Sequence, residues 1–314
     1  MNTRNSVIGF IGLGAMGSRM ATRLIDAGFK VIVYDRTEAK ARAFAAQRAA
    51  VAASTRTLAM ESDVIISCLT NDDAVKAVYW GRDGVILSAA RGTIIVEMST
   101  ISPETSRELS RLGKVRGIEV LDVAISGGPS LAENGTLTLL AGGNESAFND
   151  CEPIFAALSN QHFLLGSHGS GTAMKLVVNA VMGVSMQAIA EAVTLGERLG
   201  LQREHLLKVL SQTLVIAPAQ QNKLIRAAAN DYSPQFPLSL MNKDFHLIME
   251  QAAALQVAMP ATAAAYQMNV ARAARRPDED YSSVILEMRD LSTPSKESTQ
   301  TSRSSTNVPC NKLT

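Results

Sequence analysis

The first half of the chain alternates between short, continuously apolar runs and longer segments in which apolar residues recur every three or four positions. Continuous apolar runs of this length are typical of strands buried on both faces, and the wider spacing is typical of helices that bury one face. The pattern predicts strands at 7–11, 29–34, near 51, 64–68 and 93–97, and helices at 18–27, 38–46, 72–79 and 102–112. Such regular alternation predicts a mostly parallel sheet with helices on both faces.

The second half has a helical spacing of apolar residues almost throughout. It predicts helices at 173–199, 204–213, 218–229, 240–255, 260–274 and 281–288. Beyond residue 292 serine and threonine dominate, and such a segment buries too little apolar surface to fold alone. We therefore expect a flexible tail at 292–314.

Glycines punctuate the turn after the first strand, where the chain reads Gly12, Leu13, Gly14, Ala15, Met16 and Gly17. Gly12 allows a tight turn, Gly14 lets a pyrophosphate approach the backbone, and Gly17 lets the next helix pack closely on the strand. The second strand ends at Asp35, which lies 18 positions after Gly17. This separation is close to the value of about 20 residues expected for an acid that binds the adenosine ribose. Strand, glycine-rich turn, helix, strand and acid together predict a dinucleotide site at residues 12–17.

The expected fold class is therefore α/β, with a Rossmann, doubly wound, mostly parallel sheet followed by an all-α C-terminal domain. We expect the dinucleotide-binding domain at 1–166, the helical domain at 167–291 and the tail after it.

Asp35 and Arg36 bear on the choice of cofactor. A carboxylate at Asp35 accepts the ribose hydroxyls and repels a 2′-phosphate, which favours NAD. Arg36 leaves NADP possible, because a guanidinium there can pair with a 2′-phosphate; it can also stack on adenine or simply lie in solvent.

Two further loops follow predicted strands, and in a doubly wound sheet ligands bind at the carboxyl ends of the strands. Leu69 and Asn71 lie in the first loop and are candidate cofactor contacts. In the second, Ser99 and Thr100 are candidates for binding the nicotinamide or its ribose. Ser102 is explained by its place before a proline, which is typical of a helix N-cap.

Two groups of residues are candidates for substrate binding and catalysis. Ser126, Gly127 and Gly128 supply backbone N–H groups and a hydroxyl after a strand, which suits a carboxylate but also suits an ordinary turn. Lys175 and Asn179 stand four apart, which places an amine and an amide on one face of a helix with mostly apolar flanks.

Composition excludes several kinds of partner. With 46% hydrophobic and 19% charged residues and a net charge of +1, the chain has no excess of basic charge for nucleic acid or an anionic membrane surface. The three cysteines are widely spaced and the four histidines have no metal-ligand spacing, so neither a disulfide framework nor a metal site is expected. The near-neutral net charge instead favours a small neutral or anionic ligand. No signal peptide and no uninterrupted apolar span of about 18 residues is seen, so we expect a cytoplasmic protein.

Four motifs in order, GFIGLGAMG, DVAISGGPSLAENGTLTLLAGG, GSGTAMKLVVN and LMNKDF, give the chain a close resemblance to the β-hydroxyacid dehydrogenase family. The resemblance spans 7–288 and implies an NAD(P)-dependent oxidoreductase acting on a small β-hydroxy acid or its semialdehyde, similar to 3-hydroxyisobutyrate dehydrogenases or tartronate semialdehyde (2-hydroxy-3-oxopropionate) reductases. It implies a catalytic Lys175 supported by Asn179, substrate carboxylate binding at 126–128, and cofactor contacts from Thr100 and Lys243. It also implies a homodimer or homotetramer.

Two departures from the family pattern lie in the predicted substrate loop, where Ala124 replaces a usual proline and Leu131 a small residue. They put the identity of the substrate in doubt more than the chemistry. Other hypotheses are an imine reductase of the same fold, against which Lys175 argues, and a dinucleotide-binding interaction protein that has lost catalysis. The pair Lys243-Asp244 has a further interpretation, as a solvent-exposed pair on a helix.

Overall fold

A computed structural model describes residues 3–292, so most of the predicted tail lies outside the described residues. The chain divides into two compact units. Unit 1 contains residues up to Gly183 together with Ser239–Ala263, and unit 2 contains Val184–Leu238 and the residues from Ala264 onward. The domain boundaries expected from the sequence, at 166 and 291, stay predictions.

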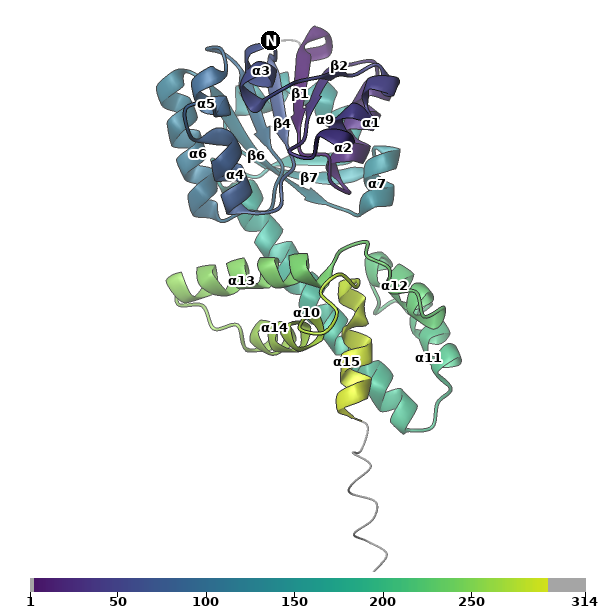
Figure 1. The fold of residues 1–314 in the computed structure, drawn as a ribbon. Coiled ribbons are helices and arrows are strands. Elements are labelled where there is room, and N and C mark those ends of the chain that lie inside the picture. Colours follow the sequence, from purple (N-terminus) through teal and green to yellow (C-terminus); the bar gives the residue numbers. More distant parts are fainter. Residues whose placement is uncertain (1–2, 293–314) are drawn as a thin grey trace, which may run out of the picture. The chain divides into compact units, whose positions relative to one another are not determined.

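Unit 1 is built on an eight-stranded sheet in the order β3-β2-β1-β4-β5-β6-β7-β8. Figure 1 shows this sheet with helices packed around it. Its strands are β1 (Val7–Ile11), β2 (Lys30–Tyr34), β3 (Ala50–Val51), β4 (Val64–Ser67), β5 (Ile94–Glu97), β6 (Glu119–Ser126), β7 (Leu137–Gly142) and β8 (Ser159–Leu164). Neighbouring strands are parallel except for β6 and β7, which pair antiparallel. The predicted mostly parallel sheet is confirmed.

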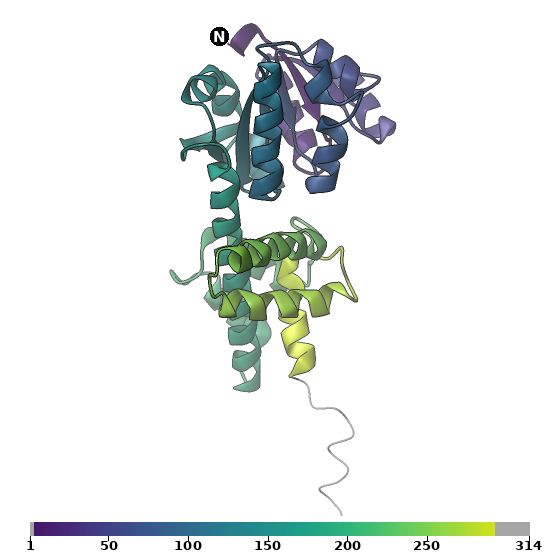
Figure 2. The same ribbon diagram turned by 90° about the vertical axis from the view of Figure 1, so that its left-hand side faces the viewer.

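Helices cover both faces of this sheet, because successive strand residues point to opposite faces and nearly all of them are apolar. One core packs side chains of the sheet against α1 (Gly17–Asp26), α2 (Glu38–Arg42), α7 (Pro129–Asn134), α8 (Glu145–Asp150) and α9 (Glu152–Leu158). The other packs the opposite face against α3 (Thr55–Met60), α4 (Asp72–Tyr79), α5 (Val85–Ser88) and α6 (Pro103–Arg116), the layer that faces the viewer in Figure 2. The sheet is therefore buried on both sides.

Several elements differ from the sequence prediction. The helix expected at 38–46 ends at Arg42, and the 3-10 turn η2 (Ala45–Gln47) follows it. Cys68 lies just after β4 rather than within it and is only partly buried. Strand β8 was not predicted because it is a largely exposed edge strand of sequence SNQHFL, which has no continuous apolar run.

The helices after the sheet are α10 (Ser170–Arg198), α11 (Arg203–Leu210), α12 (Pro218–Ala228), α13 (Leu238–Ala254), α14 (Pro260–Ala273) and α15 (Val284–Leu291), with 3-10 turns η1 (Thr3–Asn5) near the start and η3 (Tyr281–Ser283) before α15. No strand is assigned between Ser170 and Ser292, so the predicted all-helical C-terminal domain is confirmed for the described part of the chain. By length and composition alone α10 could cross a membrane, but core helices of soluble proteins pass the same test, and 44% of its most apolar window is buried.

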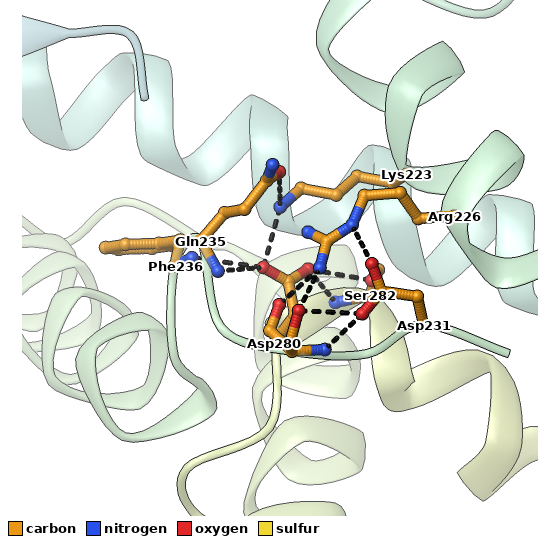
Figure 3. A network of polar contacts seen from close by, with 8 residues as sticks. Lys223, Arg226, Asp231, Gln235, Phe236, Asp280 and Ser282 are labelled. Carbon is orange, nitrogen blue, oxygen red and sulfur yellow. Dashed lines mark hydrogen bonds and ion pairs between the residues drawn. The ribbon is translucent and has the colours of Figure 1, made fainter. Parts of the chain in front are cut away.

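Unit 2 contains a buried polar network around Asp280 (Figure 3). Asp280 is fully buried, and its Oδ2 accepts from the amine of Lys223 at 2.6 Å and from the backbone N–H groups of Gln235 and Phe236 at 3.1 and 3.0 Å. Its Oδ1 accepts from the hydroxyl of Ser282 at 2.7 Å. One carboxylate thus fixes the segment that leads into α13.

Candidate active site

The sheet reverses its direction of growth between β1 and β4, which are neighbours in the sheet although β2 and β3 come between them in the chain. In sheets of this kind ligands bind beyond the carboxyl ends of the strands at that point. The glycine-rich turn follows β1, and the loop with Leu69 and Asn71 follows β4. The structure therefore brings two of the predicted cofactor loops together.

The glycine-rich turn has the geometry that a dinucleotide requires. Gly12 has a φ of 95°, and a side chain there would overlap the carbonyl oxygen of Cys68. A side chain at Gly17 would overlap the carbonyl of Gly12, so the protein's own packing requires both glycines. Gly14 is different, because it is exposed and no atom lies within 4 Å of the position its Cβ would take. Open space at the middle glycine fits the approach of a pyrophosphate.

The other residues of the turn surround this opening. Leu13 is 4% exposed, Met16 is partly buried just before α1, and Ala15 is exposed.

Asp35 follows β2 and holds the turn by its carboxylate. Its Oδ2 accepts from the backbone N–H of Leu13 and its Oδ1 from that of Thr37, both at 2.7 Å. Each carboxylate oxygen has a second acceptor site, so bonds to ribose hydroxyls stay possible. Arg36 is exposed beside it.

The loops after β4 and β5 are tied to each other. Ser99 Oγ accepts from the backbone N–H of Leu69 at 2.7 Å, and Asp72 accepts from the hydroxyl of Ser102 at 2.5 Å. Ser102 also caps α6, as predicted, by accepting from Thr105 N. Asn71, a candidate cofactor contact, caps α4 by accepting from Ala74 N at 2.9 Å. Its predicted role therefore competes with a structural one.

The turn at 126–128 lies at the end of β6. Ser126 is partly buried, and Gly127 and Gly128 are exposed. Gly127 has a φ of 134°, and no atom lies within 4 Å of a Cβ placed on Gly128. At Gly128 the turn therefore presents backbone to open space, as a carboxylate-binding turn must, whereas a Cβ on Gly127 would come within 2.9 Å of the Leu137 side chain.

A third group of residues comes from the first half of α10 and from α13, both within unit 1. Asn179 is fully buried and donates from Nδ2 to Asp244 Oδ2 at 2.5 Å. Lys243 contacts Asp244 Oδ1 at 2.7 Å and donates to the carbonyl oxygen of Thr100. Asp244 is 1% exposed, so the alternative of a solvent-exposed Lys243-Asp244 pair is wrong.

Lys175 lies one turn before Asn179 on α10 and keeps part of its surface exposed, although protein atoms crowd its amine. Burial lowers the pKa of Lys175 from its ordinary value, Asp244 opposes this shift, and Lys243 adds to it. Asn179 Oδ1 has no hydrogen-bond partner among the described residues. The group thus holds an amine with a lowered pKa and a buried acceptor that lacks a donor.

Two residues that the sequence analysis did not single out anchor this helix. Asp122 of β6 accepts from the backbone N–H groups of Gly169 and Thr172, each at 2.8 Å, at the start of α10. His168 lies in the turn before α10, and its side chain is only 12% exposed and lies 3.6 Å from Asp122. Its Nε2 lies 2.8 Å from the carbonyl oxygen of Ser106. A carboxylate within the apolar run of β6 was the available signal for Asp122.

Comparison with known proteins decides the family. The model for the NAD binding domain of 6-phosphogluconate dehydrogenase matches residues 7–166, and the model for NAD-binding of NADP-dependent 3-hydroxyisobutyrate dehydrogenase matches residues 169–288. The chain belongs to the 3-hydroxyisobutyrate dehydrogenase-like family of β-hydroxyacid dehydrogenases. The predicted resemblance is confirmed, and so is the presence of a dinucleotide-binding domain.

Several known proteins resemble this chain over most of the chain's length. It is 34% identical to 2-(hydroxymethyl)glutarate dehydrogenase of Eubacterium barkeri over 280 residues, which cover 88% of this chain and 93% of that one. The 3-hydroxyisobutyrate dehydrogenase of Mycobacterium tuberculosis, solved with L-serine, superposes with a TM-score of 0.83 at 32% identity, covering 91% and 99% of the two chains. The cytokine-like nuclear factor N-PAC of Anopheles gambiae is 32% identical over 83% of this chain but only 46% of its own length.

These relatives support NAD(P)-dependent chemistry on small hydroxy acids for the family as a whole. Choice of substrate, choice between NAD and NADP, oligomeric state and compartment stay predictions for this member.

Proposed function

We propose that the chain is an NAD(P)-dependent oxidoreductase that transfers a hydride between nicotinamide and a small β-hydroxy acid or its semialdehyde. The observation that carries the proposal is the pairing of Lys175, whose pKa is lowered, with the buried and unpartnered oxygen of Asn179. An unpartnered buried acceptor is costly unless a ligand supplies its donor. A substrate hydroxyl is such a donor.

Lys175 is the proposed general acid and base. In oxidation its neutral amine takes the hydroxyl proton of the substrate, and in reduction its ammonium gives a proton to the developing alkoxide. The lowered pKa makes the neutral amine more abundant near neutral pH than for an ordinary lysine. The bound nicotinamide supplies or accepts the hydride.

Asn179 orients the substrate hydroxyl toward Lys175 in this proposal. Its Nδ2 donates to Asp244, which fixes the amide and leaves Oδ1 as a buried acceptor without a donor among the described residues. Ser126, Gly127 and Gly128 hold the carboxylate of the substrate, through backbone donors exposed at the end of β6.

For the cofactor we propose contacts with the turn and loops already described: Gly12, Leu13, Gly14, Ala15, Met16, Gly17, Asp35, Arg36, Leu69, Asn71, Thr100 and Lys243. NAD(H) is the proposed preference, because the carboxylate of Asp35 lies at the end of β2 and repels a 2′-phosphate.

A cofactor-coupled absorbance screen tests the proposal. The acids and aldehydes to be compared are 3-hydroxyisobutyrate, glycerate, threonate, glyoxylate and succinic semialdehyde, each with NAD(H) and with NADP(H). We expect turnover of at least one of these compounds by the parent protein, and turnover lower by about 10²-fold or more in the Lys175→Arg variant under the same conditions. Absence of turnover with every compound, in a protein that binds dinucleotide, would favour an interaction protein that has lost catalysis.

A further inference from the structure

A buried carboxyl group lies at the end of β5, next to the starts of the two loops that follow β4 and β5. Glu97, the last residue of β5, is 2% exposed. Its Oε2 accepts from the hydroxyl of Ser67, the last residue of β4, and its Oε1 accepts from the backbone N–H of Ser99 at 2.7 Å. Tyr79 of α4 lies 2.6 Å from the same Ser67 hydroxyl and is fully buried. Burying a carboxyl group costs free energy even when the group is hydrogen-bonded.

The bonds of Glu97 continue into the loops that carry proposed cofactor contacts. Ser99, whose N–H it holds, accepts from the backbone N–H of Leu69 and so joins the two loops. The next residue, Thr100, offers its carbonyl oxygen to Lys243 of α13. Hydrogen bonds thus connect the side chain of Glu97 with the segments that hold Leu69 and Thr100 and, through Thr100, with Lys243.

We propose that Glu97 is a positioning residue for the cofactor site. Glu97 orients the backbone of 98–100 and holds it against the loop at 68–71. This inference rests on the proposed function, because it assigns Glu97 to the dinucleotide site. Glu97 touches neither cofactor nor substrate in this proposal; it acts through Ser99.

The same cluster makes the position of the loop depend on pH. Burial raises the pKa of Glu97 to about 7, although the hydrogen bonds from Ser67, Ser99 and Tyr79 act in the opposite direction. The titratable groups that face it are Cys68 after β4 and Tyr79 of α4. Burial raises the pKa of both, that of Cys68 to about 12, so both stay neutral near pH 7. A proton on Glu97 removes the charge that strengthens the bonds from Ser67 and Ser99, so acidification loosens the loop.

The test is the dissociation constant of NADH and of NADPH, measured by calorimetry on the full chain at pH 6, 7 and 8. In Glu97→Gln the side chain keeps its shape but loses its charge. We expect its dissociation constant at pH 8 to rise about tenfold, the usual scale for losing a charge-assisted hydrogen bond. The parent's affinity should fall between pH 8 and pH 6, and the variant's should not change in that way.

A matched control lies at the other end of the same segment. Thr93 is buried just before the start of β5, at the end of the strand opposite to the loops that bind the cofactor in this proposal. Because it shares no hydrogen-bond partner with the cofactor loops, Thr93→Val should alter cofactor affinity less than about twofold. Amide hydrogen exchange of 98–101 in the cofactor-free protein gives a second readout, and Glu97→Gln should accelerate it while Thr93→Val should not.

Unchanged affinity and unchanged exchange at 98–101 in Glu97→Gln would overturn the inference. An equal loss of affinity in Thr93→Val would also overturn it, because the effect would then be one of general stability. If the parent bound neither NADH nor NADPH, the proposed function itself would fail. A parent that binds cofactor normally but turns over no acid leaves Glu97 as a positioning residue and removes only the proposed reaction.

Discussion

Lys175 is subject to opposing influences from its neighbours. Burial and Lys243 lower its pKa, whereas Asp244 raises it. Since the amine must lose its proton before it can accept one from a hydroxyl, the position of this balance sets the pH range of the oxidation. Lys175 therefore gives the sharpest test of the proposed chemistry at the scale of single residues.

Lys175→Ala should lower turnover by about 10²-fold or more, the scale expected for removal of a positioned proton-transfer group. Nucleotide binding and folding should survive, because alanine is a good helix former. In the parent, the oxidative rate should rise with pH through an apparent pKa below the ordinary lysine value, since that of Lys175 is lowered. Steady-state rates from pH 6 to pH 10 measure both effects. A Lys175→Arg variant with most of the parent's turnover would contradict the proton-transfer role, because arginine cannot deprotonate in this range.

Asp35 is the residue that we expect to select NAD over NADP. Asp35→Asn removes the negative charge but keeps an acceptor for Leu13 N or Thr37 N. The ratio of kcat/KM for NADP to that for NAD should rise about tenfold, which corresponds to about 1.4 kcal/mol of relieved repulsion. Initial rates with both cofactors give this ratio. A parent protein that already prefers NADP(H) would show that Arg36 outweighs Asp35.

Helix α10 is the element on which the proposed catalytic residues depend, because it carries both Lys175 and Asn179. Its start is fixed by Asp122, which accepts from two backbone N–H groups that would otherwise lack partners at a helix N-terminus. Burial raises the pKa of Asp122, while His168 and the two backbone hydrogen bonds act to lower it.

Asp122→Asn should destabilise the protein by about 1–3 kcal/mol, because an amide can accept at only one of its two polar atoms and leaves one buried N–H unpaired. The midpoint of thermal unfolding should fall, and amides 169–175 should exchange faster. Asp26→Asn, on an exposed carboxylate at the end of α1, serves as the control and should unfold like the parent. Equal midpoints for the parent and Asp122→Asn would show that the first turn of α10 is held by other contacts.

Prediction of elements from sequence succeeded where the apolar pattern was strong. Strands β1, β2, β4 and β5 and the long helices lie close to their predicted positions, since continuous or periodic apolar residues mark them. Segment 129–164 was left without predicted elements, and it contains the short helices α7, α8 and α9 and the strands β7 and β8. These elements are short, and the edge strand β8 is largely exposed, so their apolar pattern is too weak to predict them and their stability depends on tertiary packing.

At the scale of the whole molecule, each compact unit has its own buried ion pair or carboxylate cluster. In unit 2, Lys223 and Asp280 form a pair whose side chains are 8% and 0% exposed. Burial alone would raise the pKa of Asp280, but Lys223, the backbone N–H of Phe236 and the hydroxyl of Ser282 together lower it. The carboxylate also fixes Gln235 and Phe236 before α13 (Figure 3).

Asp280→Ala should destabilise unit 2 by about 3–5 kcal/mol, because the change leaves the ammonium of Lys223 buried without its partner. Amide exchange at 235–236 and 282 should accelerate most. The control is Asp278→Ala, an exposed carboxylate two residues away, which should leave exchange there unchanged. If both variants behaved alike, the pair would contribute little to the unit.

The stabilising contribution of Asp280 has a defined pH range. Its pKa is lower in the folded state than the unfolded value of about 3.9, so the contribution is complete above that value and is lost as pH falls through the folded pKa. Acid unfolding of the parent followed by amide exchange at 235–236 should therefore begin below about pH 4. Loss of protection near pH 6 would point to another group.

The sequence by itself determined the fold class, the dinucleotide turn and the family, because each depends on local spacing: strand and helix periods, glycines at 12, 14 and 17, and ordered motifs. Tertiary structure alone decided which distant side chains meet. Asp244 approaches Asn179 across 65 positions of the chain, and Glu97 approaches Ser67 across 30. Burial depends on those meetings as well, and it is burial that lowers the pKa of Lys175 and raises that of Glu97. Local patterns do not encode such contacts, since a polar residue in an apolar run reads the same whether or not its partner is present.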